Sequence, residues 1–205
     1  MPAESRKEVR KRILSQATEL FRERGYHSVT LDDIAKAVNH SKVIIYRYWE
    51  SKEELLYEIT KRSHLAVIDG LTKICQSNDP PEVKLLRAVE NHVLQAMSNV
   101  GVPPFTGKLS QEVGLSPQHK QVIIKLRDKY DASLRQIIEE GIQQRRFTPC
   151  DARIVGFAIT GAMNHIQNWY SPEGELSKEE IVEVISTFVM NGVLNRCSEE
   201  TSSRR

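Results

Sequence analysis

The sequence predicts an all-α protein in which an N-terminal three-helix unit, containing a helix-turn-helix, precedes a larger helical domain. Apolar residues recur at helical spacing along most of the chain, and glycines and prolines gather at the ends of these segments. Strand-like alternation between turn residues is missing from the sequence. We therefore expect nine to ten helices and no strands. The 205 residues suffice for one large or two small domains.

The first predicted helix runs from Ser5 to about Arg24 and has one apolar face. Gly25 follows it, at the position where a C-capping glycine is common. This apolar face is expected to hold the two helices that come next.

Residues 30–52 are predicted to form the helix-turn-helix. Thr30, followed three residues later by Asp33, is typical of a capped helix start, and the apolar stripe continues to Val38. Asn39 tolerates the left-handed conformation of a tight turn.

A second short helix is predicted from Lys42 to about Trp49, with Ser41 as its cap. Ile45 and Trp49 lie four residues apart and can face inward. The rest of the surface of this helix is then formed by Lys42, Val43, Ile44, Tyr46, Arg47 and Tyr48.

The remaining helices follow from capping signals and apolar periodicity. Ser51 with Glu54 begins a helix to about Cys75, in which Asp69-Gly70 allows a bend. The later predicted helices span Glu82 to Val100, Gln118 to Gln144, Asp151 to about Trp169 and Ser177 to about Asn195, with a short segment at residues 106–113.

The net charge of the chain is only +2, but the charges are unevenly distributed. Residues 1–62 carry 13 Lys+Arg against 10 Asp+Glu, and the other 143 residues carry 16 against 17. Basic side chains cluster in the first predicted helix, between Arg6 and Arg12. Such a run is often only a solvated surface, but next to a helix-turn-helix it favours binding to DNA phosphates.

Other classes of protein are disfavoured by what the sequence lacks. Residues 1–12 do not resemble a signal peptide, and no apolar run reaches the roughly 18 residues of a membrane span, so we expect a cytoplasmic protein. Cys75, Cys150 and Cys197 are too widely spaced for a disulfide framework or a zinc site. We expect no metal, cofactor or enzymatic activity, because the corresponding motifs are missing.

Three segments resemble the tetracycline-repressor (TetR) family of bacterial transcriptional regulators over about 55 residues: Leu20–Tyr26, Thr30–Ala35 and Ser41–Leu56. Many members have glycine near the positions of Asn39 and Val43. Asparagine is compatible with a left-handed turn, whereas Val43 changes the surface offered to DNA.

The resemblance implies that the Lys42–Trp49 helix enters the major groove, which is about 12 Å wide. Lys42 and Arg47 would then read bases, Val43 and Ile44 would meet thymine methyl groups, and Thr30, Tyr46 and Lys52 would hold phosphates. For Lys52 the alternative is pairing with a carboxylate on its own helix, and for Tyr46 it is packing on the first helix. The predicted DNA-binding residues are Thr30, Ser41, Lys42, Val43, Ile44, Tyr46, Arg47, Tyr48 and Lys52.

The last two helices are predicted to form a homodimer interface. Small residues such as Gly156 and Gly161 permit close helix approach, and the final helix has a long apolar stripe. In the TetR family these helices pair with their counterparts, which implies a pseudo-palindromic DNA site with half-sites roughly 34 to 36 Å apart. The predicted interface residues are Gly161, His165, Ile181, Val184, Ile185, Phe188, Val189 and Gly192.

The resemblance also implies a small effector in the larger domain. The region from Glu139 to Ser177 is similar to regulators of fatty-acid, steroid and acyl-thioester catabolism, so acyl-CoA is a candidate. Ordinary core packing is the alternative for each predicted lining residue. The predicted lining comprises Val93, Met97, Phe105, Leu109, Ile123, Leu126, Tyr130, Phe157, Met163, Asn164 and Trp169.

Together these features predict a DNA-binding domain at residues 1–51, a ligand-binding and dimerisation domain at 52–198 and a disordered tail at 199–205. The expected function is that of a ligand-responsive repressor released from its operator by a small effector. The opposite direction of control, in which ligand promotes DNA binding, is an alternative. The alternative is a ligand-independent DNA-binding or architectural protein of the same fold.

Overall fold

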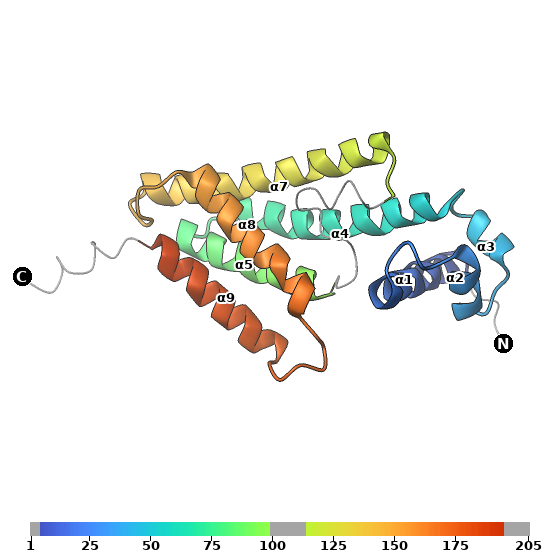
Figure 1. Ribbon diagram of the computed structural model, residues 1–205. Coiled ribbons are helices and arrows are strands. Elements are labelled where there is room, and N and C mark those ends of the chain that lie inside the picture. The colour runs from blue at the N-terminus through green and yellow to red at the C-terminus, as the bar shows by residue number, and fades with distance from the viewer. Residues whose placement is uncertain (1–4, 99–113, 195–205) are drawn as a thin grey trace, which may run out of the picture. The chain divides into compact units, whose positions relative to one another are not determined.

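The computed structural model describes residues 5–98 and 114–194 (Figure 1). These residues form eight helices and no strand, which confirms the all-α class, although nine to ten helices were expected for the whole chain. The segment predicted at residues 106–113 and the tail at 199–205 lie outside the described residues. The helices are α1 (Arg6–Arg24), α2 (Leu31–Ala37), α3 (Lys42–Tyr46), α4 (Lys52–Cys75), α5 (Pro81–Ser98), α7 (Pro117–Gln143), α8 (Ala152–Trp169) and α9 (Lys178–Val193).

The chain divides into two compact units. The N-terminal unit comprises residues 1–64 and 99–124, and the C-terminal unit comprises 65–98 and 125–205. The start of α4 belongs to the N-terminal unit, because Glu53 near its first residue is hydrogen-bonded to other residues of that unit. Glu53 accepts hydrogen bonds from Ser116 N at 2.8 Å and His119 Nδ1 at 2.6 Å.

Side-chain caps begin α1, α2, α8 and α9 at the predicted residues. Ser5, Thr30 and Ser177 each accept a hydrogen bond from the third helical residue, whose carboxylate bonds back to the capping residue. Asp151 caps α8 by accepting bonds from Arg153 N and Ile154 N. Each cap satisfies backbone N–H groups that have no partner within the first helical turn.

One local prediction was wrong. The regular helix expected from Lys42 to about Trp49 ends at Tyr46, although Trp49 N still donates to the carbonyl of Ile45 at 3.0 Å. Helix α4 continues through Asp69-Gly70 to Cys75. A Cβ at position 70 would collide with the Asn91 side chain, so Gly70 provides room for that amide.

The core of the C-terminal unit is built around α5, which packs against α8 and α9 (Figure 1). Apolar side chains from four helices of this unit are buried in it, including Leu85, Val89, Leu134, Ile138, Ile159, Ile166, Val189 and Val193. None of the described helices is both long and apolar enough to span a membrane.

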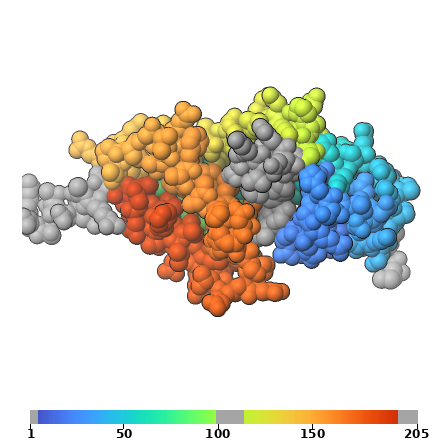
Figure 2. All heavy atoms as spheres, viewed as in Figure 1, coloured from blue at the N-terminus to red at the C-terminus, as the bar shows by residue number. Residues whose placement is uncertain are grey.

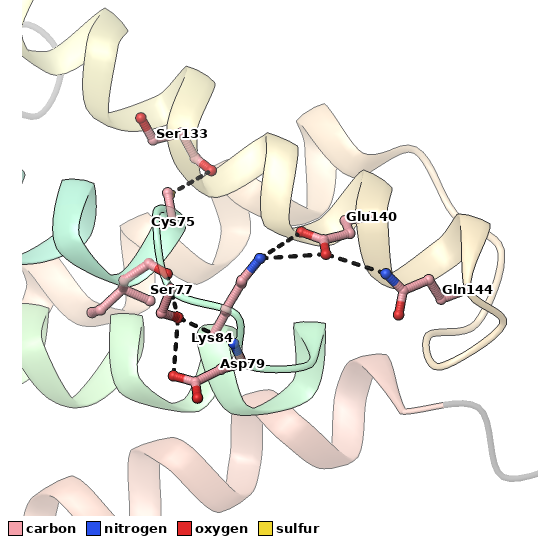
Figure 3. Close-up of polar contacts among 8 residues, drawn as sticks. Cys75, Ser77, Asp79, Lys84, Ser133, Glu140 and Gln144 are labelled. Carbon is pink, nitrogen blue, oxygen red and sulfur yellow. Dashed lines mark hydrogen bonds and ion pairs between the residues drawn. The ribbon is translucent and has the colours of Figure 1, made fainter.

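A charged pair joins α5 to α7 in the same unit (Figure 3). The buried Lys84 places its Nζ 3.1 and 3.3 Å from the two carboxylate oxygens of Glu140. Near this pair, the thiol of Cys75 points to the carbonyl oxygen of Ser133 at 3.9 Å, and burial raises its pKa. The arrangement indicates a structural connection between helices rather than a reactive thiol.

Candidate nucleic-acid interface and buried polar cluster

The turn between α2 and α3 has the predicted geometry. Asn39 has a φ of 55°, in the left-handed region, where asparagine is better tolerated than most residues. The N–H of His40 reaches back to the carbonyl of Ala35 at 3.0 Å, which closes the end of α2. Ser41 occupies the N-cap position of α3 and is exposed, without a side-chain capping bond.

One side of α3 is buried and the other faces outward. Ile45 and, just after the helix, Trp49 are buried in the N-terminal unit. Val43 is 63% exposed, and Tyr46 and Arg47 are exposed as well. The remaining three predicted contact residues on this segment, Lys42, Ile44 and Tyr48, are half-buried.

The segment after α3 is fixed by a carboxylate that the sequence analysis did not single out. Glu58 on α4 accepts hydrogen bonds from Trp49 Nε1 and Arg10 Nη2, each at 2.6 Å. The Arg10 guanidinium also lies 5.4 Å from the centre of the Trp49 ring. Glu58 thereby joins α1, α3 and α4, and Arg10, one of the basic residues expected near DNA, is engaged within the protein.

Several predicted DNA contacts already have partners inside the N-terminal unit. The hydroxyl of Thr30 accepts from Asp33 N at 3.1 Å, and this cap lowers the pKa of Asp33. Lys42 bonds to Asp32 at 2.9 Å, which raises the pKa of Lys42. The hydroxyl of Tyr48 donates to the carbonyl of Arg6 at 3.1 Å.

Lys52 has partners within the protein that were not considered from the sequence. Its ammonium donates to the carbonyls of Tyr26 and Val29, at 2.9 and 2.8 Å, and lies 4.3 Å from the centre of the Tyr26 ring. Burial lowers its pKa. Lys52 thus closes the loop between α1 and α2, on which Thr30 lies, and this role depends on contacts that local spacing does not reveal.

A second polar site lies in the core of the C-terminal unit. His92 on α5 is buried, with Nδ1 2.7 Å from the hydroxyl of Tyr130 and Nε2 3.1 Å from Oδ1 of Asn164. With the amide in this orientation, Nε2–H donates to Asn164 and Nδ1 accepts the Tyr130 proton. Burial raises the pKa of Tyr130. The sequence analysis predicted Tyr130 and Asn164 but missed His92, since a single histidine in an apolar stripe carries no distinctive signal.

The other predicted lining residues separate into groups. Val93, Met97 and Met163 are buried in the C-terminal unit, and Leu126 is half-buried there. Ile123 is buried but belongs to the N-terminal unit. Phe105 and Leu109 lie outside the described residues.

Two of the predicted lining residues do not face the core. Phe157 and Trp169 are 47% and 49% exposed. Both are on α8, whose inward side is formed by Ile159, Met163 and Ile166. Phe157 and Ile159 are two residues apart and therefore point in nearly opposite directions on a helix. Phe157 and Trp169 thus form part of the surface of the C-terminal unit rather than its core.

The outward faces of α8 and α9 carry large apolar side chains, and Figure 2 shows the two helices side by side in orange and red. Phe188 is 68% exposed, and Val184 and Ile154 are exposed too. A Cβ added at Gly161 or Gly192 would meet no atom within 4 Å. We call this the α8–α9 face and define it by Ile154, Phe157, Gly161, His165, Val184, Phe188 and Gly192, all of which are exposed or, as the glycines, open to solvent.

The predicted interface set requires a correction at two positions. Ile181 and Val189 are buried in the core of the C-terminal unit, and Ile185 is half-buried. Helix α9 has apolar residues on two adjacent sides, and these positions belong to the inward one. The exposed Ile154 was not singled out from the sequence, because the apolar period of α8 does not show which side faces outward.

Both parts of the chain match known protein families. Residues 13–59 match the model of bacterial regulatory proteins of the tetR family, and residues 78–193 match a tetracyclin repressor-like C-terminal domain. The chain belongs to the tetR family, whose members are DNA-binding transcriptional regulators and not enzymes.

Relatives with the same organisation span most of the chain. The uncharacterized HTH-type transcriptional regulator YhgD of Bacillus subtilis is 26% identical over 188 residues, which cover 90% of this chain and 96% of YhgD. The TetR family regulator PfmR from Thermus thermophilus is 30% identical, with a TM-score of 0.79 over 88% of this chain and 98% of PfmR. AibR, solved in complex with isovaleryl coenzyme A and operator DNA, is 22% identical, with a TM-score of 0.74 over 88% of this chain and 97% of AibR.

Proposed function

We propose that this regulator is a repressor that binds a pseudo-palindromic operator as a homodimer and is released by a small lipophilic effector. The observation that carries the DNA-binding part is the division of α3 into a buried and an outward side. Ile45 and Trp49 fix the segment in the N-terminal unit, and Val43, Tyr46 and Arg47 remain exposed. A single helix with such a face fits the major groove.

The partners seen in the structure refine the proposed roles at the interface. Arg47 and Lys42 read base edges, with Lys42 exchanging Asp32 for DNA, and Val43 and Ile44 contact thymine methyl groups. The sugar–phosphate backbone of the DNA is contacted by Thr30, Ser41, Tyr46 and Tyr48. Lys52 acts indirectly, by holding the loop that ends at Thr30, because its ammonium is already bound to two carbonyls.

The proposed dimer uses the α8–α9 face. Exposed apolar residues of this size, gathered on two neighbouring helices, are characteristic of protein–protein interfaces. Gly161 and Gly192 leave space above the helix backbones, where the helices of a second copy can approach closely. Two-fold pairing then requires operator half-sites about one turn apart, roughly 34 to 36 Å.

The proposed effector site is the His92 cluster with its apolar surroundings, Val93, Met97 and Met163. An apolar region with a few convergent polar groups is the usual composition of a small-molecule site. The fold is shared with AibR, whose structure contains isovaleryl coenzyme A, and this supports an acyl-CoA as the effector class. The ligand would act by preferring the dimer geometry that does not fit the operator.

Selection of bound genomic fragments, followed by footprinting, tests the DNA-binding part of the proposal. The expected product is a protected pseudo-palindrome with two half-sites about 10 base pairs apart. Fragments without any shared sequence would contradict it and favour the architectural alternative.

Isothermal titration against acyl-CoAs of graded chain length tests the effector part. Tyr130→Phe removes one hydroxyl of the cluster and should weaken binding, whereas Tyr170→Phe, at another buried tyrosine of the same unit, should not. Absence of binding at every chain length would remove the acyl-CoA proposal and leave the DNA-binding proposal intact.

A further inference from the structure

A surface groove lies between α5 and α9 in the C-terminal unit, apart from the His92 cluster. Its volume is about 560 Å³, which is within the range of small-molecule sites. Leu86 and Leu94 on α5 and Val182 and Met190 on α9 supply an apolar lining. Leu94 is among the exposed large apolar side chains of the described residues. The groove can therefore bury an aliphatic group.

The charged residues of the groove are all acidic. Glu90, Glu179 and Glu183 contribute to the lining, which contains no lysine or arginine. Within the part of the chain that the structure describes, none of these three carboxylates forms an ion pair. Carboxylates gathered beside a low-dielectric surface concentrate positive charge from solution. The groove is thus complementary to a cation and repels an anion.

A buried hydroxyl in the groove lacks a hydrogen-bond partner. Ser186 lines the groove and is only 4% exposed, and its Oγ is unpaired among the described residues. A serine in a helix usually bonds to the carbonyl of the preceding turn, which this hydroxyl does not do. Leaving a buried hydroxyl unpaired is unfavourable. A ligand with N–H donors would satisfy it.

The groove and the α8–α9 face meet along α9. Val184 and Ser186 are two residues apart and point about 200° from each other on an α-helix, and Met190 shares the side of Ser186. Thr187 and Asn191, which also line the groove, lie within about 60° and 20° of the direction of Val184. A dimer formed through the α8–α9 face would therefore border one edge of the groove.

We propose that this groove binds an amphipathic organic cation, namely a protonated primary amine with an aliphatic tail. The ammonium group lies among the glutamates and donates N–H bonds to Glu90, Glu183 and the hydroxyl of Ser186. The tail covers Leu86 and Leu94. Because this site is separate from the His92 cluster, it does not depend on an acyl-CoA being the effector.

Isothermal titration of the full chain with n-decylammonium, below its micelle concentration, tests the proposal. Saturable binding at one site per chain is expected, and it should weaken at high salt because screening reduces the attraction. n-Butylammonium, which lacks the tail, and n-decyl sulfate, which has the opposite charge, should bind at least tenfold more weakly. Equal affinity for the sulfate, or no saturable binding of n-decylammonium, would overturn the proposal.

A matched pair of double variants locates the site. Glu90→Gln with Glu183→Gln removes two groove carboxylates and should weaken n-decylammonium binding about three- to tenfold. Glu173→Gln with Glu175→Gln makes the same change of net charge in the exposed loop before α9 and should have no effect. Equal weakening by both pairs would show only a general charge effect and would contradict binding in the groove.

Ser186→Ala tests whether the unpaired hydroxyl binds the ligand or affects only the packing of the free protein. Removal of an unsatisfied buried group should raise the unfolding midpoint of the free protein and lower its affinity for n-decylammonium. A rise in stability with unchanged affinity would exclude Ser186 from the site.

Discussion

The indole N–H of Trp49 donates to the carboxylate of Glu58 at 2.6 Å, and this bond fixes the chain directly after α3 to α4. Ile45 and Trp49 alone would hold α3 only by apolar contact. The hydrogen bond adds direction, because the same carboxylate also accepts from Arg10 on α1. The outward face of α3 is therefore oriented by two other helices of the N-terminal unit, α1 and α4.

Trp49→Phe should destabilise the protein by about 1 to 3 kcal/mol, because it removes a hydrogen bond to a charged acceptor together with part of a buried ring. The measurement is the free energy of unfolding from a urea titration. Trp169→Phe, at the exposed tryptophan of α8, serves as the control and should change it little. Equal unfolding midpoints for both variants would show that the bond between Trp49 and Glu58 contributes nothing.

Glu53 should make stability depend on pH. Its burial opposes ionisation, but the bonds from Ser116 N and His119 outweigh this, and the pKa is lowered from the ordinary value of 4.5. A lowered pKa means that the stabilisation is present above the unfolded-state value and is lost as the pH falls through the folded-state value.

The difference in unfolding free energy between wild type and Glu53→Gln should therefore be largest near about pH 7 and should shrink towards about pH 3. The Glu173→Gln variant controls for the loss of one exposed carboxylate. A difference that stays constant across this range would contradict the role of the Glu53 carboxylate.

The effect of Gly70→Ala on stability should depend on the residue at position 91. In an otherwise unchanged chain, a Cβ added at position 70 would displace the Asn91 side chain. The Nδ2 of Asn91 donates to the carbonyl of Val67 at 3.0 Å, and this bond would be lost. The lost bond offsets the gain of about 1 kcal/mol that alanine normally brings to a helix. With Asn91→Ala already present, Gly70→Ala should stabilise the protein by about 1 kcal/mol. A double-mutant cycle measured by thermal unfolding checks this, and additive effects would refute the proposed collision.

Loss of one partner of the Lys84–Glu140 pair should destabilise the protein more than loss of both (Figure 3). Glu140→Ala leaves a buried ammonium without its carboxylate and should cost about 1 to 3 kcal/mol. Adding Lys84→Met removes that charge and should recover part of the loss. Urea unfolding of the single and double variants provides the test, and a double variant less stable than Glu140→Ala would contradict it.

The fold was largely predictable because its signals are local. The capping pairs Ser5/Glu8, Thr30/Asp33 and Ser177/Glu180 mark three helix starts. The left-handed turn at Asn39 also follows from the residue type. Such features depend on neighbours three or four residues away, which the sequence shows directly.

The errors concern contacts between distant residues. The partners of Lys52 are carbonyls more than 20 residues away in the sequence, which local spacing cannot show. Helices α8 and α9 are apolar on more than one side, so periodicity placed Phe157 inside and Ile181 outside, the reverse of what is observed. A helical pattern gives the sides of a helix but not the neighbour that each side meets.

The most direct test of the central proposal, that the outward face of α3 reads DNA sequence, is the ratio of operator to random-DNA affinity in a mobility-shift competition. Arg47→Ala should lower this ratio about tenfold or more, the cost of one lost base contact, while binding to random DNA changes little. Arg135→Ala, at an exposed arginine of α7, should leave the ratio unchanged. A ratio that Arg47→Ala does not alter would contradict the assignment of this face to base recognition.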